Sequence, residues 1–380
     1  MKRETQLTQI GRKHHGKRQV NPAIERASTV LAGQAHELYN RPDGIPLYGR
    51  FGTASQSALK KALCELTAAD YCALAPSGLS AMTLPVMADI RAGDHLLVAD
   101  CLDGPTRMFL ADLVSQWGVE IEYFDPRTGE GIASQIKENT RLVFCESPGS
   151  LTFEIQDIPA IAQAAKPSGA AVIVDDTWSA GINANMLNLG ATYAAQSLTK
   201  YVGGHSDVMM GAVVARGEAA ERLRQAEWRL GLTVSPDDAY LALRGLRTLK
   251  LRMDRSAETA LAIADQLANH PAVDRVIHPA RPDHPDHAIF TRDFTAPAGV
   301  FGVEFTGWNI ARSERFLDAL KIFGLGFSWG GYESLAVHCD PQLRRHYWPE
   351  RDTALIRLAI GLEHADDLWS DLEQAIAASA

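Results

Sequence analysis

The feature that most constrains the fold of this chain is a series of short apolar runs that alternate with segments of helical spacing. The runs are YCALAP (71–76), HLLVAD (95–100), VEIEYF (119–124), RLVFCE (141–146), AAVIVD (170–175), YAAQS (193–197) and MGAVVA (210–215). Apolar residues with helical spacing lie between them, at 79–90, 105–116 and 157–166. Buried strands that alternate with helices are typical of βαβ units. We therefore predict an α/β fold with a mostly parallel central sheet flanked by helices.

The rest of the chain divides into an irregular beginning and a second, smaller alternating region. Residues 1–50 are polar, are interrupted by prolines and show little periodicity, so this arm has to pack on something else, such as another subunit. Helices are predicted at 217–230, 236–249, 254–268, 311–320 and 365–378, with strand-like runs VDRVIH, VFGVEF and LIRLAIG after residue 270. We predict an arm over 1–50, a large domain over 51–250 and a smaller C-terminal α/β domain over 251–380.

Composition argues against several classes of protein. The 380 residues include 37 Lys and Arg against 46 Asp and Glu, and a net charge of −9 is unusual for a nucleic-acid-binding chain. No apolar run approaches the ~20 residues of a membrane span, and the charged N-terminus lacks the apolar stretch of a secretory signal. The 5 cysteines form no CxxC pair, so we expect reduced thiols, no metal site and a cytoplasmic location. Prolines in PDHPDH (282–287) favour a solvated loop over a metal site.

Two predicted strands end in residues that suit a charged ligand. The first run is followed by Ser77, Gly78 and Leu79 at the start of a predicted helix. Free N–H groups and the helix dipole there favour a phosphate, although an ordinary helix cap would have the same sequence. Asp175, at the end of the run 170–175, is either a functional carboxylate or a cap of the next helix. Ligands of parallel sheets bind beyond the carboxyl ends of the strands, where these residues lie.

A third strand end places Lys200 directly after a buried strand, next to the hydroxyl residues Ser197 and Thr199. A lysine in such a site can have a lowered pKa and form a Schiff base, although a lysine at a sheet edge that extends to solvent would look similar. The two hydroxyls would reach toward a phosphate. Pyridoxal phosphate requires a lysine, a carboxylate at its ring nitrogen and a phosphate cup. The three strand ends together predict pyridoxal 5′-phosphate as the cofactor of the domain over 51–250.

Longer motifs around these positions carry a resemblance to a known family. They are Tyr48-Gly-Arg50 followed by Gly-Thr, Glu146-Ser-Pro-Gly149, Asp175-Asp-Thr-Trp178, Thr199-Lys-Tyr201, Gly204-His-Ser-Asp207, Ser328-Trp-Gly-Gly-Tyr-Glu-Ser334 and Ile356-Arg-Leu-Ala-Ile-Gly-Leu-Glu363. Over residues 20–378 the chain resembles the cysteine/methionine-metabolism (trans-sulfuration, γ-family) pyridoxal-phosphate enzymes of fold type I. Within that family the motifs are most similar to those of the bacterial cystathionine β-lyases.

The resemblance implies a role for each matched residue. Lys200 would carry the cofactor and move a proton between the substrate's α-carbon and the leaving sulfur, with Asp175 at the ring nitrogen. Arg357 would grip the α-carboxylate through a bidentate guanidinium. The other implied site residues are Ser77, Gly78, Leu79, Thr177, Ser197 and Thr199 for the cofactor, Ser328 and Trp329 for the substrate, and Tyr240 as a nearby active-site tyrosine. Tyr48 and Arg50 match residues that reach a neighbouring subunit's phosphate, which implies a dimer with shared sites, usually paired into a tetramer.

The chain departs from the family's pattern on the leaving-group side of the site. Asp103 stands where the family has a tyrosine that stacks over the ring, and a second carboxylate there would alter charge and proton placement. Phe51 follows Arg50 where the bacterial β-lyases have a second arginine, and Met108 replaces an acidic residue. These changes would weaken the binding of the zwitterionic far end of cystathionine.

The predicted function is therefore a pyridoxal-phosphate carbon–sulfur lyase that acts on an L-amino acid by α,β-elimination. Its default reaction converts cystathionine into homocysteine, pyruvate and ammonia. Asp103 leaves open a diverged enzyme in which this residue is catalytic, performing racemisation, replacement at Cβ or carbon–carbon bond chemistry. A binding or regulatory protein without turnover is disfavoured by the intact Lys200, Asp175 and Arg357. The expected partners are an amino-acid substrate and further copies of the chain, with no nucleic acid and no membrane.

Overall fold

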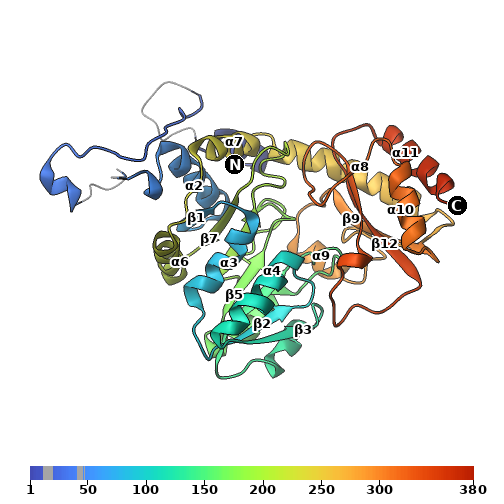
Figure 1. Ribbon diagram of the computed structural model, residues 1–380, viewed down its shortest axis with the longest axis horizontal. Coiled ribbons are helices and arrows are strands. Elements are labelled where there is room, and N and C mark those ends of the chain that lie inside the picture. The colour runs from blue at the N-terminus through green and yellow to red at the C-terminus, as the bar shows by residue number, and fades with distance from the viewer. Residues whose placement is uncertain (12–19, 41–45, 47) are drawn as a thin grey trace.

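The larger of two sheets forms the centre of the molecule (Figure 1). The computed structural model describes residues 1–11, 20–40, 46 and 48–380. The sheet has 7 strands in the order β1-β7-β6-β5-β4-β2-β3. They are β1 (Tyr71–Ala75), β2 (His95–Ala99), β3 (Glu120–Phe124), β4 (Thr140–Glu146), β5 (Ala171–Asp175), β6 (Tyr193–Ser197) and β7 (Gly211–Ala215). Only β7 pairs antiparallel, with β1 and β6, so the predicted mostly parallel sheet is confirmed.

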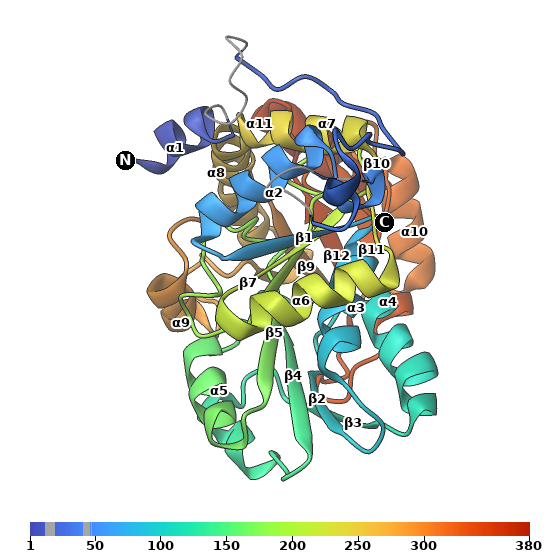
Figure 2. The ribbon, with the colours of Figure 1, turned by 90° about the vertical axis from the view of Figure 1, so that its left-hand side faces the viewer.

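Helices that precede, connect and follow the strands cover this sheet (Figure 2). They are α2 (Ala54–Thr67), α3 (Gly78–Asp89), α4 (Gly104–Met108), α5 (Ile158–Ala165), α6 (Gly217–Leu230) and α7 (Pro236–Leu246). The helix predicted over 105–116 is shorter than expected, because α4 gives way to a π turn (Phe109–Val114) and a 3-10 turn (Ser115–Trp117). With helices packed against the sheet, strands such as β2, β5 and β7 are buried along their length, which explains their uninterrupted apolar sequences.

A second sheet organises the C-terminal region. It has 5 strands in the order β10-β11-β12-β9-β8 and a separate cluster of buried apolar side chains. Its elements are β8 (Val273–Ile277), α9 (His287–Asp293), β9 (Val300–Thr306), α10 (Ile310–Ala319), β10 (Gly324–Leu325), β11 (Leu335–His338), β12 (Thr353–Ala359) and α11 (Ala365–Ala378). Helix α8 (Leu249–Ala268) connects the two regions (Figure 1). The predicted domain boundary at 250–251 falls at the start of α8 and stays a prediction.

The N-terminal arm is more ordered at its start than its sequence suggested. Helix α1 (Arg3–Gln9) was not predicted, and it buries Leu7 and Ile10 against the body of the protein, where α1 contacts α8. Farther along, Glu25 and Arg26 still contact the starts of α2 and α7, and the described residues that follow, up to residue 40, stand away from the body (Figure 1). It exposes Leu31 and Tyr39 almost fully, at 88% and 87%. A seven-residue helix carries too weak a periodic signal to stand out among polar residues.

Two histidines near PDHPDH correct the expectation of a solvated loop. His278 and His284 are both buried. The ring of His278 packs against Trp178 and Phe301, and its Nδ1 accepts a hydrogen bond from the Ala280 amide. These partners come from distant parts of the chain, so the local sequence could not show the burial. In the described part of the chain, no helix combines the length and apolar character that a membrane span requires.

Candidate active site

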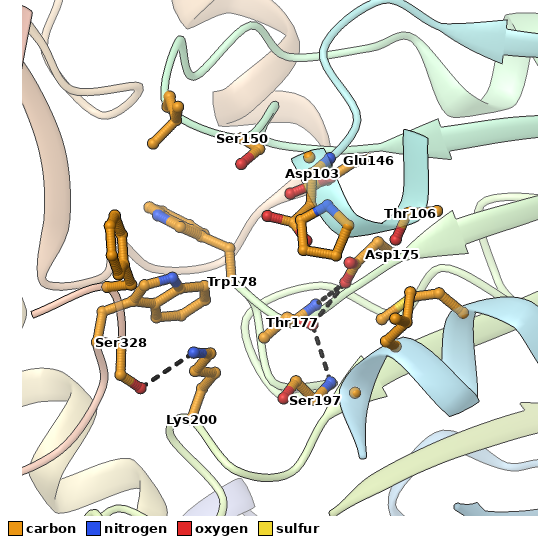
Figure 3. A pocket seen from close by; sticks show the side chains of 18 of the residues that line it. Asp103, Thr106, Glu146, Ser150, Asp175, Thr177, Trp178, Ser197, Lys200 and Ser328 are labelled. Carbon is orange, nitrogen blue, oxygen red and sulfur yellow. Dashed lines mark hydrogen bonds between the residues drawn. The ribbon is translucent and has the colours of Figure 1, made fainter. Parts of the chain in front are cut away.

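A cavity of about 850 Å³ lies where the parallel strands of the large sheet end (Figure 3). One wall comes from the turns after β1, β2, β4, β5 and β6, and the other comes from the C-terminal region. Most predicted site residues line this cavity. They are Ser77, Gly78, Leu79, Asp103, Asp175, Thr177, Ser197, Thr199, Lys200, Ser328, Trp329 and Arg357. The structure therefore brings these strand ends together around one cavity.

The turn into α3 forms the end of the cavity that suits an anion. Ser77 caps the helix, with its Oγ accepting a hydrogen bond of 3.1 Å from the Ser80 amide. The next amides, of Gly78 and Leu79, belong to the first helical turn, where N–H groups have no acceptor within the helix. A Cβ on Gly78 would lie 2.6 Å from Ser197 Oγ, so only glycine allows the turn to approach β6 this closely. Backbone amides and the Ser197 hydroxyl are thereby gathered at one helix N-terminus.

Asp175 closes the inner end of the cavity at the end of β5. Its Oδ1 accepts hydrogen bonds from the amide of Thr177, at 3.0 Å, and from its hydroxyl, at 2.5 Å. Burial raises the pKa of Asp175 to about 7, against the effect of the Thr177 bonds, and the nearby carboxylate of Asp103 adds to the increase. A cation placed against Oδ2 would reverse this shift. The site therefore favours a positively charged group beside Asp175.

Lys200 enters the cavity from the turn after β6. Its Nζ donates a hydrogen bond of 3.0 Å to Ser328 Oγ (Figure 3). Burial, together with the charge of Arg357, lowers the pKa of this amine. A lowered pKa increases the fraction of neutral lysine, which is the form that acts as a nucleophile or a base.

Arg357, on β12, presents a guanidinium that is only partly satisfied. Its Nη2 donates to the carbonyl oxygens of Phe327, at 2.9 Å, and Ser328, at 3.1 Å. Its Nε is buried and has no hydrogen-bond partner among the described residues. Burial lowers the pKa of this arginine. A buried donor without an acceptor is costly, so a carboxylate in the cavity would complete the site.

Two charged residues that line the cavity, Glu146 and Arg345, were not singled out as functional from the sequence. Glu146 ends β4, and its Oε2 accepts a hydrogen bond of 2.7 Å from the Asp103 amide. Burial, with the charges of Asp175 and Asp103, raises the pKa of Glu146 well above its usual range. Its place at a strand end was a usable signal, since Asp175 was found that way. Arg345 also lines the cavity, but it lies in an irregular segment and carried no such signal.

Other predicted residues lie elsewhere in the single chain. Tyr48 and Arg50 are exposed and do not line the cavity, and Arg50 Nη1 donates to the Trp228 carbonyl oxygen at 3.1 Å. Tyr240, on α7, is not part of the cavity wall either. Thr199 does line the cavity, and its hydroxyl exchanges hydrogen bonds with the backbone of Met210.

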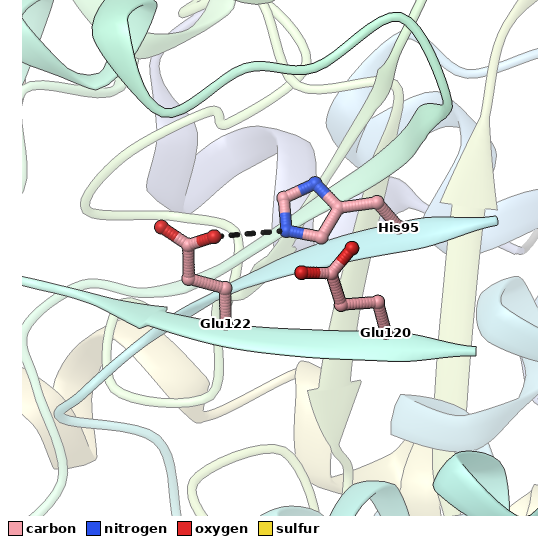
Figure 4. Close-up of side chains that lie close together, drawn as sticks. All are labelled: His95, Glu120 and Glu122. Atoms are coloured by element: carbon pink, nitrogen blue, oxygen red, sulfur yellow. Dashed lines mark ion pairs between the residues drawn. The ribbon is translucent and has the colours of Figure 1, made fainter.

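A second group of titratable residues lies at the opposite, amino-terminal ends of β2 and β3. His95, Glu120 and Glu122 have ligand atoms close enough for a metal ion (Figure 4). Lys137 Nζ, however, lies 2.7 Å from a carboxylate oxygen of each glutamate. Burial, aided by the Lys137 charge, lowers the pKa of His95. The ammonium already forms an ion pair with each carboxylate, so this group is a structural ion-pair network.

Comparison with known proteins decides the family. The model of the family described as Cys/Met metabolism PLP-dependent enzyme matches residues 4–377. The chain belongs to this family. A cystathionine beta-lyase of Bordetella avium is 43% identical over 94% of this chain and 92% of its own length. An L-alanine/L-glutamate racemase of Wolbachia pipientis is 33% identical over 99% of this chain and 97% of its own length. The crystal structure of metB from Corynebacterium glutamicum superposes with a TM-score of 0.91, at 31% identity, over 99% of this chain and 98% of that one.

As a member of this family the protein is a pyridoxal-phosphate enzyme, and its cavity fits that cofactor. The close approach of Gly78 to Ser197 brings backbone amides and a hydroxyl to one pocket that can bind an anion, as a phosphate requires. The carboxylate of Asp175 lines the cavity, where it could meet a protonated ring nitrogen, and Lys200 is half-buried with a lowered pKa, as a cofactor-bearing lysine should be. The superposition also confirms the predicted fold of type I enzymes.

Proposed function

We propose that this enzyme is a carbon–sulfur lyase that removes a thiol from Cβ of an L-amino acid by α,β-elimination. The first substrate to consider is L-cystathionine, which with one water gives L-homocysteine, pyruvate and ammonia. The proposal is supported by the site and by the name of the Bordetella relative. It keeps the chemistry predicted from the sequence and assigns it to residues of one cavity.

The observation that carries the proposal is that Ser328 contacts both reactive ends of the site. Its Oγ accepts a hydrogen bond from Lys200, and its carbonyl oxygen accepts one from Arg357. A substrate whose α-carboxylate is held by Arg357 would therefore have its α-carbon near Lys200 Nζ. Proximity of this kind replaces a bimolecular proton transfer by one within a bound complex.

Each residue then has a defined task. Pyridoxal phosphate, when bound, supplies an electron-withdrawing ring that makes the α-proton of the attached amino acid acidic. Asp175 holds the proton on the ring nitrogen. Arg357 orients the α-carboxylate, and Lys200 takes the α-proton and delivers a proton to the departing sulfur. Ser328 keeps the amine of Lys200 directed into the cavity.

The assembly proposed for this enzyme is a homodimer with shared active sites, paired into a tetramer in the cytoplasm. In the single chain Tyr48 and Arg50 are exposed outside the cavity, which is what a role in a neighbouring subunit would require. The segment 20–40, with the exposed Leu31 and Tyr39, gives the arm apolar side chains that a second subunit could cover.

The test is an assay of the purified, cofactor-loaded protein with L-cystathionine. Free thiol is followed with a chromogenic disulfide and pyruvate with lactate dehydrogenase, and the proposal expects the two products in equal amounts. Cysteine and 2-oxobutyrate instead would indicate γ-elimination. Absence of thiol release from L-cystathionine and from smaller cysteine thioethers would refute the lyase.

A further inference from the structure

Asp103 is placed differently from most aspartates at the start of a helix. It is the N-cap residue of α4, a position at which the side chain usually accepts hydrogen bonds from the first helical amides. The Asp103 side chain makes no regular capping bond, although the adjacent amide of Gly104 acts on the carboxylate as a hydrogen-bond donor. It lines the cavity instead, and Figure 3 shows it entering from the side opposite to Lys200. A carboxylate that lines the cavity opposite a reactive amine is placed to exchange a proton with a molecule bound between them.

The backbone that carries Asp103 is held by several hydrogen bonds. The Asp103 amide donates to Glu146 Oε2 at 2.7 Å. The preceding carbonyl, of Leu102, accepts a bond of 3.0 Å from Arg345 Nη1. Asp100 Oδ2 accepts two further bonds, of 2.6 and 2.8 Å, from backbone amides of the C-terminal region. The direction of the carboxylate is therefore set by the packing of two regions of the fold, as a positioned catalytic group requires.

Charged groups of both signs act on Asp103. Burial raises its pKa, whereas the cations Lys200, Arg345 and Arg357 act in the opposite direction. The carboxylates of Glu146 and Asp175 share the same cavity, and Asp103 raises the pKa of both. Several carboxylates in one buried space cannot all ionise easily, so one of them tends to hold a proton. A carboxyl group that holds a proton in this way can act as a proton donor.

We propose that Asp103 is a second proton-transfer residue that faces Lys200 across the cavity. With one group on each side, the enzyme can take the α-proton of a bound amino acid from one face and return a proton on the other, which gives the mirror-image amino acid. This inference rests on the proposed function, because both use Lys200 as the base at the α-carbon. The Wolbachia relative, named as a racemase, shows that the family includes this outcome.

The protons balance in this step. Lys200, as the neutral amine, takes the α-proton and becomes an ammonium, and Asp103, as the carboxylic acid, gives its proton to the α-carbon. The substrate has changed configuration without gaining or losing atoms. Exchange of one proton between the ammonium, solvent and the Asp103 carboxylate restores both groups. The step should be most evident with amino acids such as L-alanine, which have no leaving group at Cβ to divert the reaction into elimination.

The test compares wild type with Asp103→Asn in deuterium oxide, using the cofactor-loaded enzyme and L-alanine. Exchange of the α-proton is followed by NMR, and the enantiomers are separated by chiral chromatography. Wild type should exchange the α-proton and form D-alanine. Asp103→Asn should still exchange it, through Lys200, but should form D-alanine at least about tenfold more slowly, since loss of a general acid typically costs more than that.

A matched control is Asp112→Asn, which removes an exposed carboxylate from the π turn that continues α4. It should racemise like wild type. The inference is overturned if Asp103→Asn forms D-alanine at the wild-type rate, or if wild type exchanges the α-proton and forms none. In both cases release of thiol from L-cystathionine leaves the proposed lyase intact. Absence of both exchange and thiol release would refute the lyase as well.

A second readout does not depend on turnover. Infrared difference spectra of the cofactor-free protein, wild type minus Asp103→Asn, isolate the carbonyl stretch of the protonated Asp103 carboxyl. We expect this band to persist to a higher pH than that of an exposed aspartate, and the difference spectrum of Asp112→Asn to lack it. A band that disappears in the range of an ordinary surface aspartate would contradict the role as a proton donor.

Discussion

Lys200 Nζ donates a hydrogen bond of 3.0 Å to Ser328 Oγ, and this contact joins the two sheets of the enzyme. Lys200 follows β6 of the large sheet, and Ser328 lies between β10 and β11 of the C-terminal sheet. Through its carbonyl oxygen Ser328 also accepts a hydrogen bond from Arg357 on β12. The amine and the guanidinium are therefore positioned relative to each other by the packing of two regions, not by either region alone.

We expect Lys200 to be the residue that binds the cofactor covalently. Reduction of the yellow protein with borohydride, followed by peptide mapping, should place the label on the peptide that contains Lys200. The physical reason is burial beside Arg357, which lowers the pKa of this amine and makes it nucleophilic. Lys200→Ala should still bind cofactor through the phosphate pocket but should give no stable label. A label on another lysine would refute the assignment.

Replacing Arg357 by alanine should weaken substrate binding while the absorbance of the cofactor is kept. Loss of a buried charge pair typically costs about 2–5 kcal/mol, which corresponds to a rise in KM of roughly 30-fold or more. The KM of Arg357→Lys should lie between those of wild type and Arg357→Ala, because an ammonium keeps the charge but loses the planar pair of donors. Steady-state kinetics on the three proteins measure this. An unchanged KM in Arg357→Ala would show that the carboxylate binds elsewhere.

Mixing two inactive variants should restore some activity if the active sites are shared between subunits. Arg50→Ala would lack the proposed phosphate contact, and Lys200→Ala would lack the base. A hybrid dimer contains one site in which both residues are intact. Activity should therefore rise from the background of the parents toward a fraction of wild type after subunit exchange. If exchange is shown by mass spectrometry and activity does not rise, each site belongs to one chain.

The buried histidines predict loss of stability in mild acid. Burial lowers the pKa of His278 from 6.5 to about 4. The unfolded chain therefore takes up a proton at a higher pH than the folded protein does. The contribution of neutral His278 to the free energy of unfolding is fully present above pH 6.5. It decreases by about 3 kcal/mol as the pH falls toward 4.

Thermal unfolding measured between pH 7 and pH 4.5 tests this expectation. The melting temperature of wild type should fall steadily as the pH is lowered over this range. The fall should be smaller in His278→Gln, because glutamine cannot take up a proton. His287→Gln is the matched control, because this histidine is only half-buried. Equal slopes in wild type and His278→Gln would contradict the prediction, because His278 would then bind no extra proton on unfolding.

The sequence was informative wherever structure depends on neighbouring residues. Five of the seven apolar runs end at the last residue of their strand and the other two end one residue later, because burial on both faces requires consecutive apolar side chains. Asp175 and Lys200 could be recognised because a strand end is itself a local feature, and the topology of a parallel sheet then brings such ends to one edge. Glu146 also ends a predicted strand, so the same reasoning could have identified it as a site residue, but it entered the prediction only as part of a motif.

What the sequence could not reveal depends on contacts between distant segments. Ser328 meets Lys200 across 128 positions, and Arg345 holds the Leu102 carbonyl across 243. His278 is buried by rings from other elements, although its own neighbourhood reads as a polar loop. The sequence by itself determined the strands, the family and the chemistry at the strand ends, since these follow from local patterns. Only the tertiary structure decided which groups face each other across the cavity, Asp103 and Lys200 among them, because that depends on how the two sheets pack against each other.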